Sequence, residues 1–313
     1  MAHVTFIHGI ANKPPPDELL RIWRQALADD GDALPLGDLG VTSRMVYWAD
    51  VLYAAPDADA AAHEGILENS PEAIDGGGDA ELPVPTTVEE RIFLEGLRDR
   101  LTDLSNAEIM AAGAPDPTDE APLGLERVPL PWSFKKRFMA AFLRDAHHYL
   151  FDVNFSPRPG EQYRVQQEIR RRFVEALGDS LITRPHVVVS HSMGTVIAYD
   201  CLKRVSECPP VDGFMTLGSP LGLDEIQDQL QPGWSRRDGY PHETIFGGWA
   251  NAYDRLDPVC GFAARLANDF RQAGNRVIDD RRVSNGGKWR HSIGKYLRQS
   301  RVRSQLRQLL DLP

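Results

Sequence analysis

The sequence predicts an α/β fold with a mostly parallel central sheet, helices on both faces of that sheet, and a helical cap or lid insertion. One observation is an apolar, β-branched run at residues 186–189 that passes directly into a segment with helical periodicity. Strand and helix patterns alternate after this run, and such alternation implies crossover connections between parallel strands. The third observation is a change of composition that begins at residue 55. We interpret residues 55–152 as the insertion and residues 1–54 and 153–313 as the α/β framework.

The composition of the 313-residue chain excludes several classes of protein. Its hydrophobic fraction of 42% is enough for a sizeable core, and its formal net charge of −10 argues against a nucleic-acid partner. No apolar run approaches the roughly 18 residues of a membrane span, so we expect no stable membrane insertion. The three cysteines are odd in number and sparse, which favours a cytoplasmic protein, although a secreted protein that has lost its signal peptide fits the same pattern. The Cys, His and Asp residues are too scattered for a metal site, and no cofactor is expected.

The N-terminal part predicts a strand, a tight turn and a helix. Residues 3–7 form the strand candidate, and His8, Gly9 and Ile10 follow it at once. A glycine directly after a buried strand lets the backbone turn sharply and approach a ligand. A helix is predicted after three consecutive prolines, and a second strand is predicted at residues 41–47.

The segment that follows has the character of an insertion. Residues 55–126 are rich in glycine, proline and acidic residues. Residues 87–104 and 133–151 are predicted to form amphipathic helices, the second of them aromatic. Since an insertion between early strands emerges at the carboxyl edge of such a sheet, we expect a cap or lid over that edge, where Ser192 follows the central strand. Direct packing of the aromatic helix on the sheet is compatible with this expectation.

The second half of the chain predicts the rest of the sheet. A charged helix at residues 161–177 leads into the central strand, and further strands are expected at residues 214–217, 245–253 and 276–283. Ligands of parallel sheets bind beyond the carboxyl ends of the strands. Basic residues near the C-terminus are predicted to form a solvated face: Arg298, Arg301, Arg303 and Arg307.

Ser192 is predicted to lie on a sharp turn between the central strand and the next helix. Such a turn exposes the serine hydroxyl, and the unpaired N–H groups of the helix N-terminus lie behind it. Small residues two positions before and after the serine let the strand and helix pass closely, and Ser190 and Gly194 meet this requirement. A serine that only caps the following helix fits the same pattern.

The five residues from Ser190 to Gly194 resemble the nucleophile elbow of the α/β-hydrolases, with Ser190 in place of the usual glycine. The His-Gly turn after the first strand is similar to the oxyanion loop of lipase-type members. The resemblance implies that Ser192 is a nucleophile. It also implies that the backbone N–H groups of Ile10 and Met193 bind the oxyanion of a tetrahedral intermediate.

In this family an acid and then a histidine follow the nucleophile along the chain. Asp257, which precedes Pro258 after a strand, resembles the family's acid loop and is our preferred candidate, with Asp254 second and Asp224 third. Asp257 is also suited to cap a helix that begins near Pro258. His291 comes late, after a strand and a glycine-containing loop and before a helix, where the family keeps its general base.

Together these elements imply a serine hydrolase that cleaves carboxylic esters through an acyl-enzyme, with a small-molecule or lipid ester as substrate. An acyltransferase or a thioesterase would use the same triad. A catalytically silent binding protein on this fold is a third hypothesis, because function depends on the site rather than on the fold. The sequence leaves the oligomeric state open.

Overall fold

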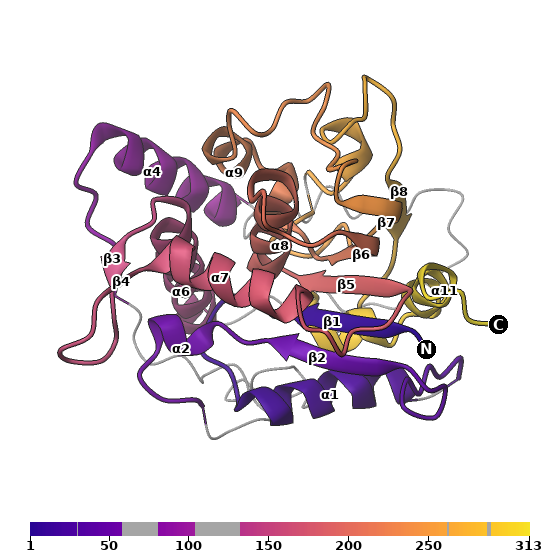
Figure 1. Ribbon diagram of the computed structural model, residues 1–313. Helices are drawn as coiled ribbons and strands as arrows, with labels where there is room; N and C mark the ends of the chain where they lie inside the picture. Colours follow the sequence, from indigo (N-terminus) through magenta and orange to yellow (C-terminus); the bar gives the residue numbers. More distant parts are fainter. Residues whose placement is uncertain (30, 58–80, 104–131, 262, 287–288) are drawn as a thin grey trace.

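The computed structural model describes residues 1–29, 31–57, 81–103, 132–261, 263–286 and 289–313 (Figure 1). Its centre is a six-stranded sheet in the order β2-β1-β5-β6-β7-β8, in which every neighbouring pair is parallel. The strands are β1 (His3–Ile7), β2 (Thr42–Val46), β5 (His186–His191), β6 (Val211–Leu217), β7 (Ile245–Tyr253) and β8 (Asp279–Arg282). A separate antiparallel pair joins β3 (Asn154–Phe155) to β4 (Tyr163–Arg164). The predicted parallel α/β architecture is confirmed.

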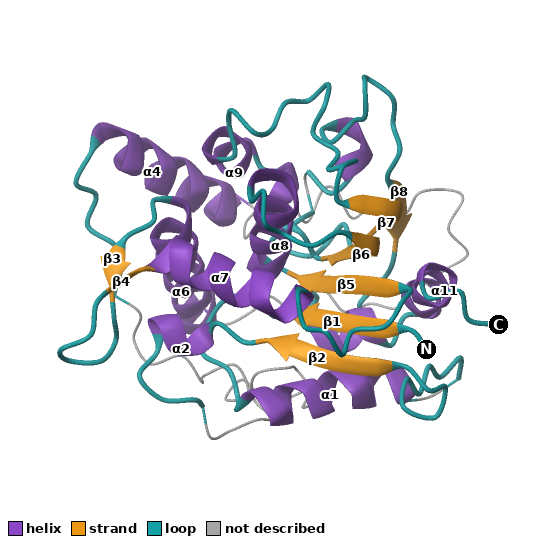
Figure 2. Ribbon diagram, in the orientation of Figure 1, coloured by secondary structure: helices purple, strands orange, loops and turns teal. Residues whose placement is uncertain are grey.

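Helices cover both faces of the sheet (Figure 2). The α-helices are α1 (Pro16–Ala28), α2 (Ala49–Leu52), α4 (Val88–Asp103), α6 (Trp132–Leu150), α7 (Val165–Leu177), α8 (Met193–Arg204), α9 (Asp224–Gln229), α10 (Ile293–Leu297) and α11 (Ser300–Leu309). The described residues also contain the short 3-10 helices η2 (Pro220–Gly222) and η3 (Leu266–Asn268). Residues 58–80 and 104–131 of the expected insertion lie outside the described residues.

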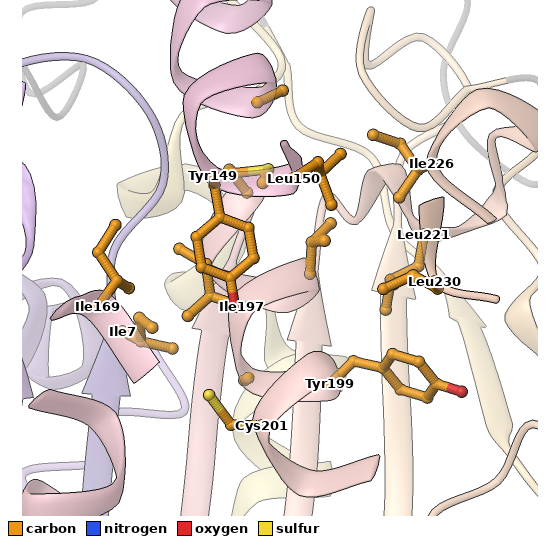
Figure 3. Packing of buried hydrophobic residues seen from close by; sticks show 14 of the residues in the cluster. Ile7, Tyr149, Leu150, Ile169, Ile197, Tyr199, Cys201, Leu221, Ile226 and Leu230 are labelled. Carbon is orange, nitrogen blue, oxygen red and sulfur yellow. The ribbon is translucent and has the colours of Figure 1, made fainter. Parts of the chain in front are cut away.

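The central strand β5 contributes to two separate cores because its side chains alternate between the faces of the sheet. Val188 points into the core that contains residues of α6, α7 and α8. Val187 and Val189 point into the core formed with α1, α10 and α11. Figure 3 shows part of the first core, where Tyr149, Ile169 and Ile197 bring α6, α7 and α8 together. The β-branched run therefore forms a strand that is buried on both faces.

Several predicted boundaries differ from the observed ones. The helix expected at residues 161–177 begins at Val165, because the two residues before it pair with β3 as strand β4. The last strand is limited to Asp279–Arg282. No helix begins near Pro258, where the chain forms a turn. Helices α4 and α6 agree with the two helices expected in the insertion to within one residue at each end.

The prediction of a solvated arginine face is wrong for Arg303. Its side chain is 2% exposed and donates hydrogen bonds to the carbonyl groups of Leu297, Ala26 and Asp29. The last two carbonyl groups lie at the C-terminal end of α1, where a helix leaves carbonyls without an internal donor and carries partial negative charge. Arg303 therefore joins α11 to the end of α1.

Helix α6 lies at the carboxyl edge of the sheet. In Figure 1 the arrowheads of β2 and β5 point toward the side on which α4 and α6 lie. Asp145 of α6 accepts a hydrogen bond from the backbone N–H of Ala11, in the loop after β1. Phe138 of the same helix contacts the rings of Trp289 and His291. Among the described residues no helix is long and apolar enough to cross a membrane.

Candidate active site

Ser192 lies on the sharp turn that the sequence predicted, between the end of β5 at His191 and the start of α8 at Met193. Its φ of 53° and ψ of −130° lie in a region that residues other than glycine rarely adopt, so the backbone is strained. Two hydrogen bonds hold this conformation: Ser192 N donates to Leu217 O at 3.0 Å, and Thr195 N donates to Ser192 O at 2.9 Å. The side chain of Ser192 does not cap α8.

Two glycines allow the backbone to pass close to this turn. A Cβ atom at Gly194 would lie 2.5 Å from His8 O and 2.8 Å from Ile7 O. A Cβ atom at Gly9 would lie 2.6 Å from Ser192 Cβ. Neither position has space for a side chain, so the loop after β1 lies in close contact with Ser192.

Ser190 occupies the position where the α/β-hydrolase pattern usually has glycine. It is fully buried, and its hydroxyl group donates a hydrogen bond of 2.8 Å to Met215 O on the neighbouring strand β6. The hydroxyl satisfies a bond across the sheet, and a buried hydroxyl without such a partner would be costly. The departure from glycine is therefore accommodated by the sheet itself.

Asp257 and His291 form a buried pair. His291 Nδ1 lies 2.8 Å from Asp257 Oδ2 and 2.9 Å from Oδ1. Burial alone would raise the pKa of Asp257, but the charge and hydrogen bond of His291, together with bonds from Tyr296 and Val259, hold that pKa below its ordinary value. Because a carboxylate can only accept, Nδ1 of His291 carries the proton and Nε2 is left with a lone pair. The bond from Val259 N to Asp257 Oδ1, at 2.8 Å, closes a local turn rather than capping a helix.

The Asp257–His291 pair lies against Gly218, the residue after the β6 strand end that is hydrogen-bonded to Ser192. Gly218 follows Leu217, whose carbonyl group accepts the hydrogen bond from Ser192 N. A Cβ atom at Gly218 would lie 2.9 Å from Asp257 Oδ2 and 3.2 Å from His291 Cε1. Ser192 is 0% exposed, so the prediction of an exposed hydroxyl is wrong. Ser192 Oγ and His291 Nε2 are both buried, and neither has a hydrogen-bond partner among the described residues. The structure thus joins Asp257 to His291, and no hydrogen bond joins His291 to Ser192.

Aromatic rings surround His291. The ring of His191 lies 4.6 Å from the His291 ring between centroids, and His191 Nε2 donates to His291 O at 2.9 Å. Burial, followed by the charges of His291 and Lys13, lowers the pKa of His191 well below its ordinary value, so its ring is neutral. Phe138 and Trp289 also contact the His291 ring, each edge to face at 5.8 Å between centroids.

Asp254, the second candidate acid, is occupied elsewhere. Its carboxylate accepts hydrogen bonds from Leu256 N, Asn285 N and Arg290 Nη1 at 2.7–3.0 Å. Burial raises the pKa of Asp254, while Arg290 and the two backbone donors oppose that rise. Asp254 thus anchors the loop that precedes His291, and Asp257 is the carboxylate that contacts the imidazole.

Asp224, the third candidate, does not join this group. It is the first residue of α9, has an exposed side chain and forms an ion pair of 3.2 Å with Arg100. No group of three or more His, Cys, Asp or Glu residues in the described part of the chain is placed to hold a metal ion.

The loop after β1 presents Ile10, whose N–H group, like that of Met193, has no acceptor among the described residues. His8 Nε2 accepts a hydrogen bond from Trp48 N at 2.9 Å, so its Nδ1 carries the proton and donates to Gly9 O at 2.7 Å. Burial lowers the pKa of His8 well below its ordinary value, which keeps the ring neutral. In a trans peptide C=O and N–H point in opposite directions, so this bond fixes the direction of the Ile10 N–H.

Asp145 and Tyr296 contribute contacts that the sequence did not predict as parts of the site. Asp145 is fully buried on α6 and accepts a bond of 2.8 Å from the N–H of Ala11, a residue with a φ of 69°. Tyr296 donates to Asp257 Oδ2 at 2.7 Å. The apolar spacing of Ile293, Tyr296 and Leu297 is a signal from which the burial of Tyr296 could have been predicted. Asp145 gave no signal, because a polar residue on an amphipathic helix is expected to face solvent.

Comparison with known proteins gives one family match and several solved structures of low similarity. Residues 109–310 match the profile described as the alpha/beta hydrolase family. A YdeN-like hydrolase from Pectobacterium atrosepticum is 17% identical with a TM-score of 0.32, over 50% of this chain and 76% of that one. Acetyl xylan esterase 1 from Thermoanaerobacterium is 11% identical with a TM-score of 0.32, over 99% of this chain and 74% of that one. No curated protein matches the sequence.

Proposed function

Because the chain belongs to the alpha/beta hydrolase family, we propose that it is a serine hydrolase that cleaves carboxylic esters. Ser192 is the nucleophile, His291 the general base and Asp257 the carboxylate that orients the histidine. The observation that carries the proposal is the buried Asp257–His291 hydrogen bond beside a strained Ser192, with both Ser192 Oγ and His291 Nε2 lacking a partner among the described residues.

The reaction has two halves. His291 Nε2 takes the proton of Ser192 as Oγ attacks the ester carbonyl carbon, and the carbonyl oxygen becomes an oxyanion. When the tetrahedral intermediate collapses, the C–O bond to the alcohol breaks and the alcohol leaves with the proton from His291. Water then attacks the acyl-enzyme with His291 again as base, which releases the acid and restores Ser192.

Backbone donors and the carboxylate supply the electrostatic part of catalysis. The N–H groups of Ile10 and Met193 bind the oxyanion, and each such donor contributes about 3 kcal/mol to lowering the barrier. The strained turn at Ser192 and the bond from His8 to Gly9 O hold these donors in place before the substrate binds. Asp257 keeps His291 in the tautomer that can accept a proton and stabilises the imidazolium that forms.

The proposal is tested by labelling with a fluorophosphonate and by hydrolysis of p-nitrophenyl acetate. We expect an adduct on Ser192 in the wild-type protein, and Ser192→Ala to lower the hydrolysis rate to less than about a hundredth. Ser190→Gly is the matched control, because it removes a neighbouring hydroxyl and introduces the residue usual in the family. It should still be labelled.

A folded wild-type protein that gains no adduct on Ser192 and hydrolyses no ester would contradict the proposal and favour a silent binding protein. Product analysis with an added alcohol acceptor, or with a CoA thioester in place of the ester, separates ester hydrolysis from acyl transfer and thioester hydrolysis. These experiments use the same variants, so the comparison isolates the role of Ser192.

A further inference from the structure

The hydroxyl group of Tyr296 contacts two of the three aspartates considered for the site, Asp257 and Asp254. It lies 2.7 Å from Asp257 Oδ2 and 3.1 Å from the backbone N of Asp254, and Cys260 Sγ lies 3.7 Å away. The tyrosine is fully buried on α10, five residues after His291. We propose that Tyr296 is a positioning residue that acts through Asp257 and sets the pH below which the enzyme loses activity. This inference rests on the proposed function.

The direction of the hydrogen bond follows from the partners. The backbone N–H of Asp254 can only donate, so it occupies a lone pair of the Tyr296 oxygen. The carboxylate of Asp257 can only accept, so the phenolic proton points at Oδ2. Burial and the charge of Asp257 raise the pKa of Tyr296 well above its ordinary value, which keeps this proton in place.

Two donors therefore share one oxygen of the carboxylate. Asp257 Oδ2 accepts from Tyr296 and from His291 Nδ1 at nearly equal distances of 2.7 and 2.8 Å. A hydrogen bond to a charged acceptor is stronger than a neutral one and draws charge away from the other donor. Without the Tyr296 hydroxyl, more of the carboxylate charge would act on His291 and favour its protonated form. A protonated His291 cannot accept the proton of Ser192, so activity would be lost at a higher pH.

Other groups that face His291 stay the same when the hydroxyl is removed. His191 lies against the His291 ring at a tilt of 33° and is neutral, and the charge of Lys13 acts on His191. Asp254 is paired with Arg290 at 3.0 Å. On the side of α6 and the preceding loop, the contacting rings of Phe138 and Trp289 carry no charge. The bond to Asp257 is therefore the contact through which Tyr296 affects the histidine.

The test measures the rate of fluorophosphonate modification of Ser192, and of p-nitrophenyl acetate hydrolysis, as a function of pH. On the acidic side of the pH–rate profile, the acid limb, the midpoint is the pH at which the rate falls to half its maximum. In Tyr296→Phe this midpoint should rise by about half a pH unit to one pH unit. Tyr199→Phe is the matched control, since Tyr199 is also fully buried and donates to Gly239 O at 2.7 Å, away from this pair. Its acid limb should stay in place even if the variant is less stable.

An unchanged or lowered midpoint in a folded Tyr296→Phe protein would overturn the inference, whatever the loss of maximal rate. If Tyr296→Phe does not fold, the same pH–rate measurement on a protein with meta-fluorotyrosine in place of Tyr296 tests the inference. The fluorinated phenol is the more acidic donor, so the midpoint should move down, and an unchanged midpoint overturns the inference. Failure of the proposed function looks different, because wild-type Ser192 would then not be labelled at any pH.

Discussion

Gly9→Ala tests how tightly the loop after β1 is packed against the nucleophile. The added methyl group would lie 2.6 Å from Ser192 Cβ, 3.2 Å from Ser192 Oγ and 3.3 Å from His191 O. The φ angle of Gly9 lies outside the left-handed region, so alanine can adopt this backbone conformation without strain. The effect of the substitution is therefore steric and acts directly on the serine.

The size of the effect follows from these distances. An ordinary carbon contact begins at 3.4 Å, so Ser192 and the loop must separate by about 1 Å. A displacement of about 1 Å at a reacting group lowers rates by roughly a hundredfold. Overpacking of a buried site also costs about 1–3 kcal/mol of folding free energy. We expect a loss of roughly a hundredfold in kcat/KM, together with a lower denaturation midpoint.

The assay compares kcat/KM for p-nitrophenyl acetate and the rate of fluorophosphonate labelling in wild type, Gly9→Ala and Gly248→Ala. Gly248 lies in β7, and a Cβ atom there would meet only Leu309 Cδ2, at an ordinary 3.5 Å. The control should keep its activity. A folded Gly9→Ala protein within about threefold of wild type in both assays would refute the steric argument, because it would mean that the loop and Ser192 separate without cost to the site.

Two further predictions concern buried polar groups. Asp145→Ala removes the acceptor of the Ala11 N–H and should lower kcat by roughly ten- to a hundredfold with little change in KM. Asp145→Asn keeps an acceptor oxygen and should lose less activity. Equal losses of kcat in the two variants would count against this role of Asp145. Burial lowers the pKa values of His3 and His186 from 6.5 to about 4, so the folded state binds fewer protons than the unfolded state between these values. The free energy of unfolding should therefore be highest above about pH 6.5 and fall as the pH approaches about 4. In urea denaturation measured over this pH range, His186→Gln should show a smaller fall than the wild type. The same pH dependence in both proteins would contradict a lowered pKa of His186.

Local patterns in the sequence determined the framework. The β-branched residues 187–189 form a strand because their side chains pack on both faces of a sheet, and the small residue Gly194 permits the close approach of β1. These requirements involve neighbours in the chain, so a short stretch of sequence is enough to predict them. For the same reason the parallel sheet and the strand-to-helix turn at Ser192 could be predicted without coordinates.

Contacts between distant residues were decided by the tertiary structure. Asp254 and Asp257 follow the same strand three residues apart, and only the folded chain shows that one holds the Asn285 loop while the other contacts His291. The burial of Arg303 could not be predicted either, because two of its acceptors, Ala26 and Asp29, lie at the end of α1, more than 270 residues away in the sequence. The hydrogen-bond partner of a side chain depends on its residue type and on the direction in which the side chain points. The residue type can be read from the sequence, whereas the packing of separate elements sets the direction.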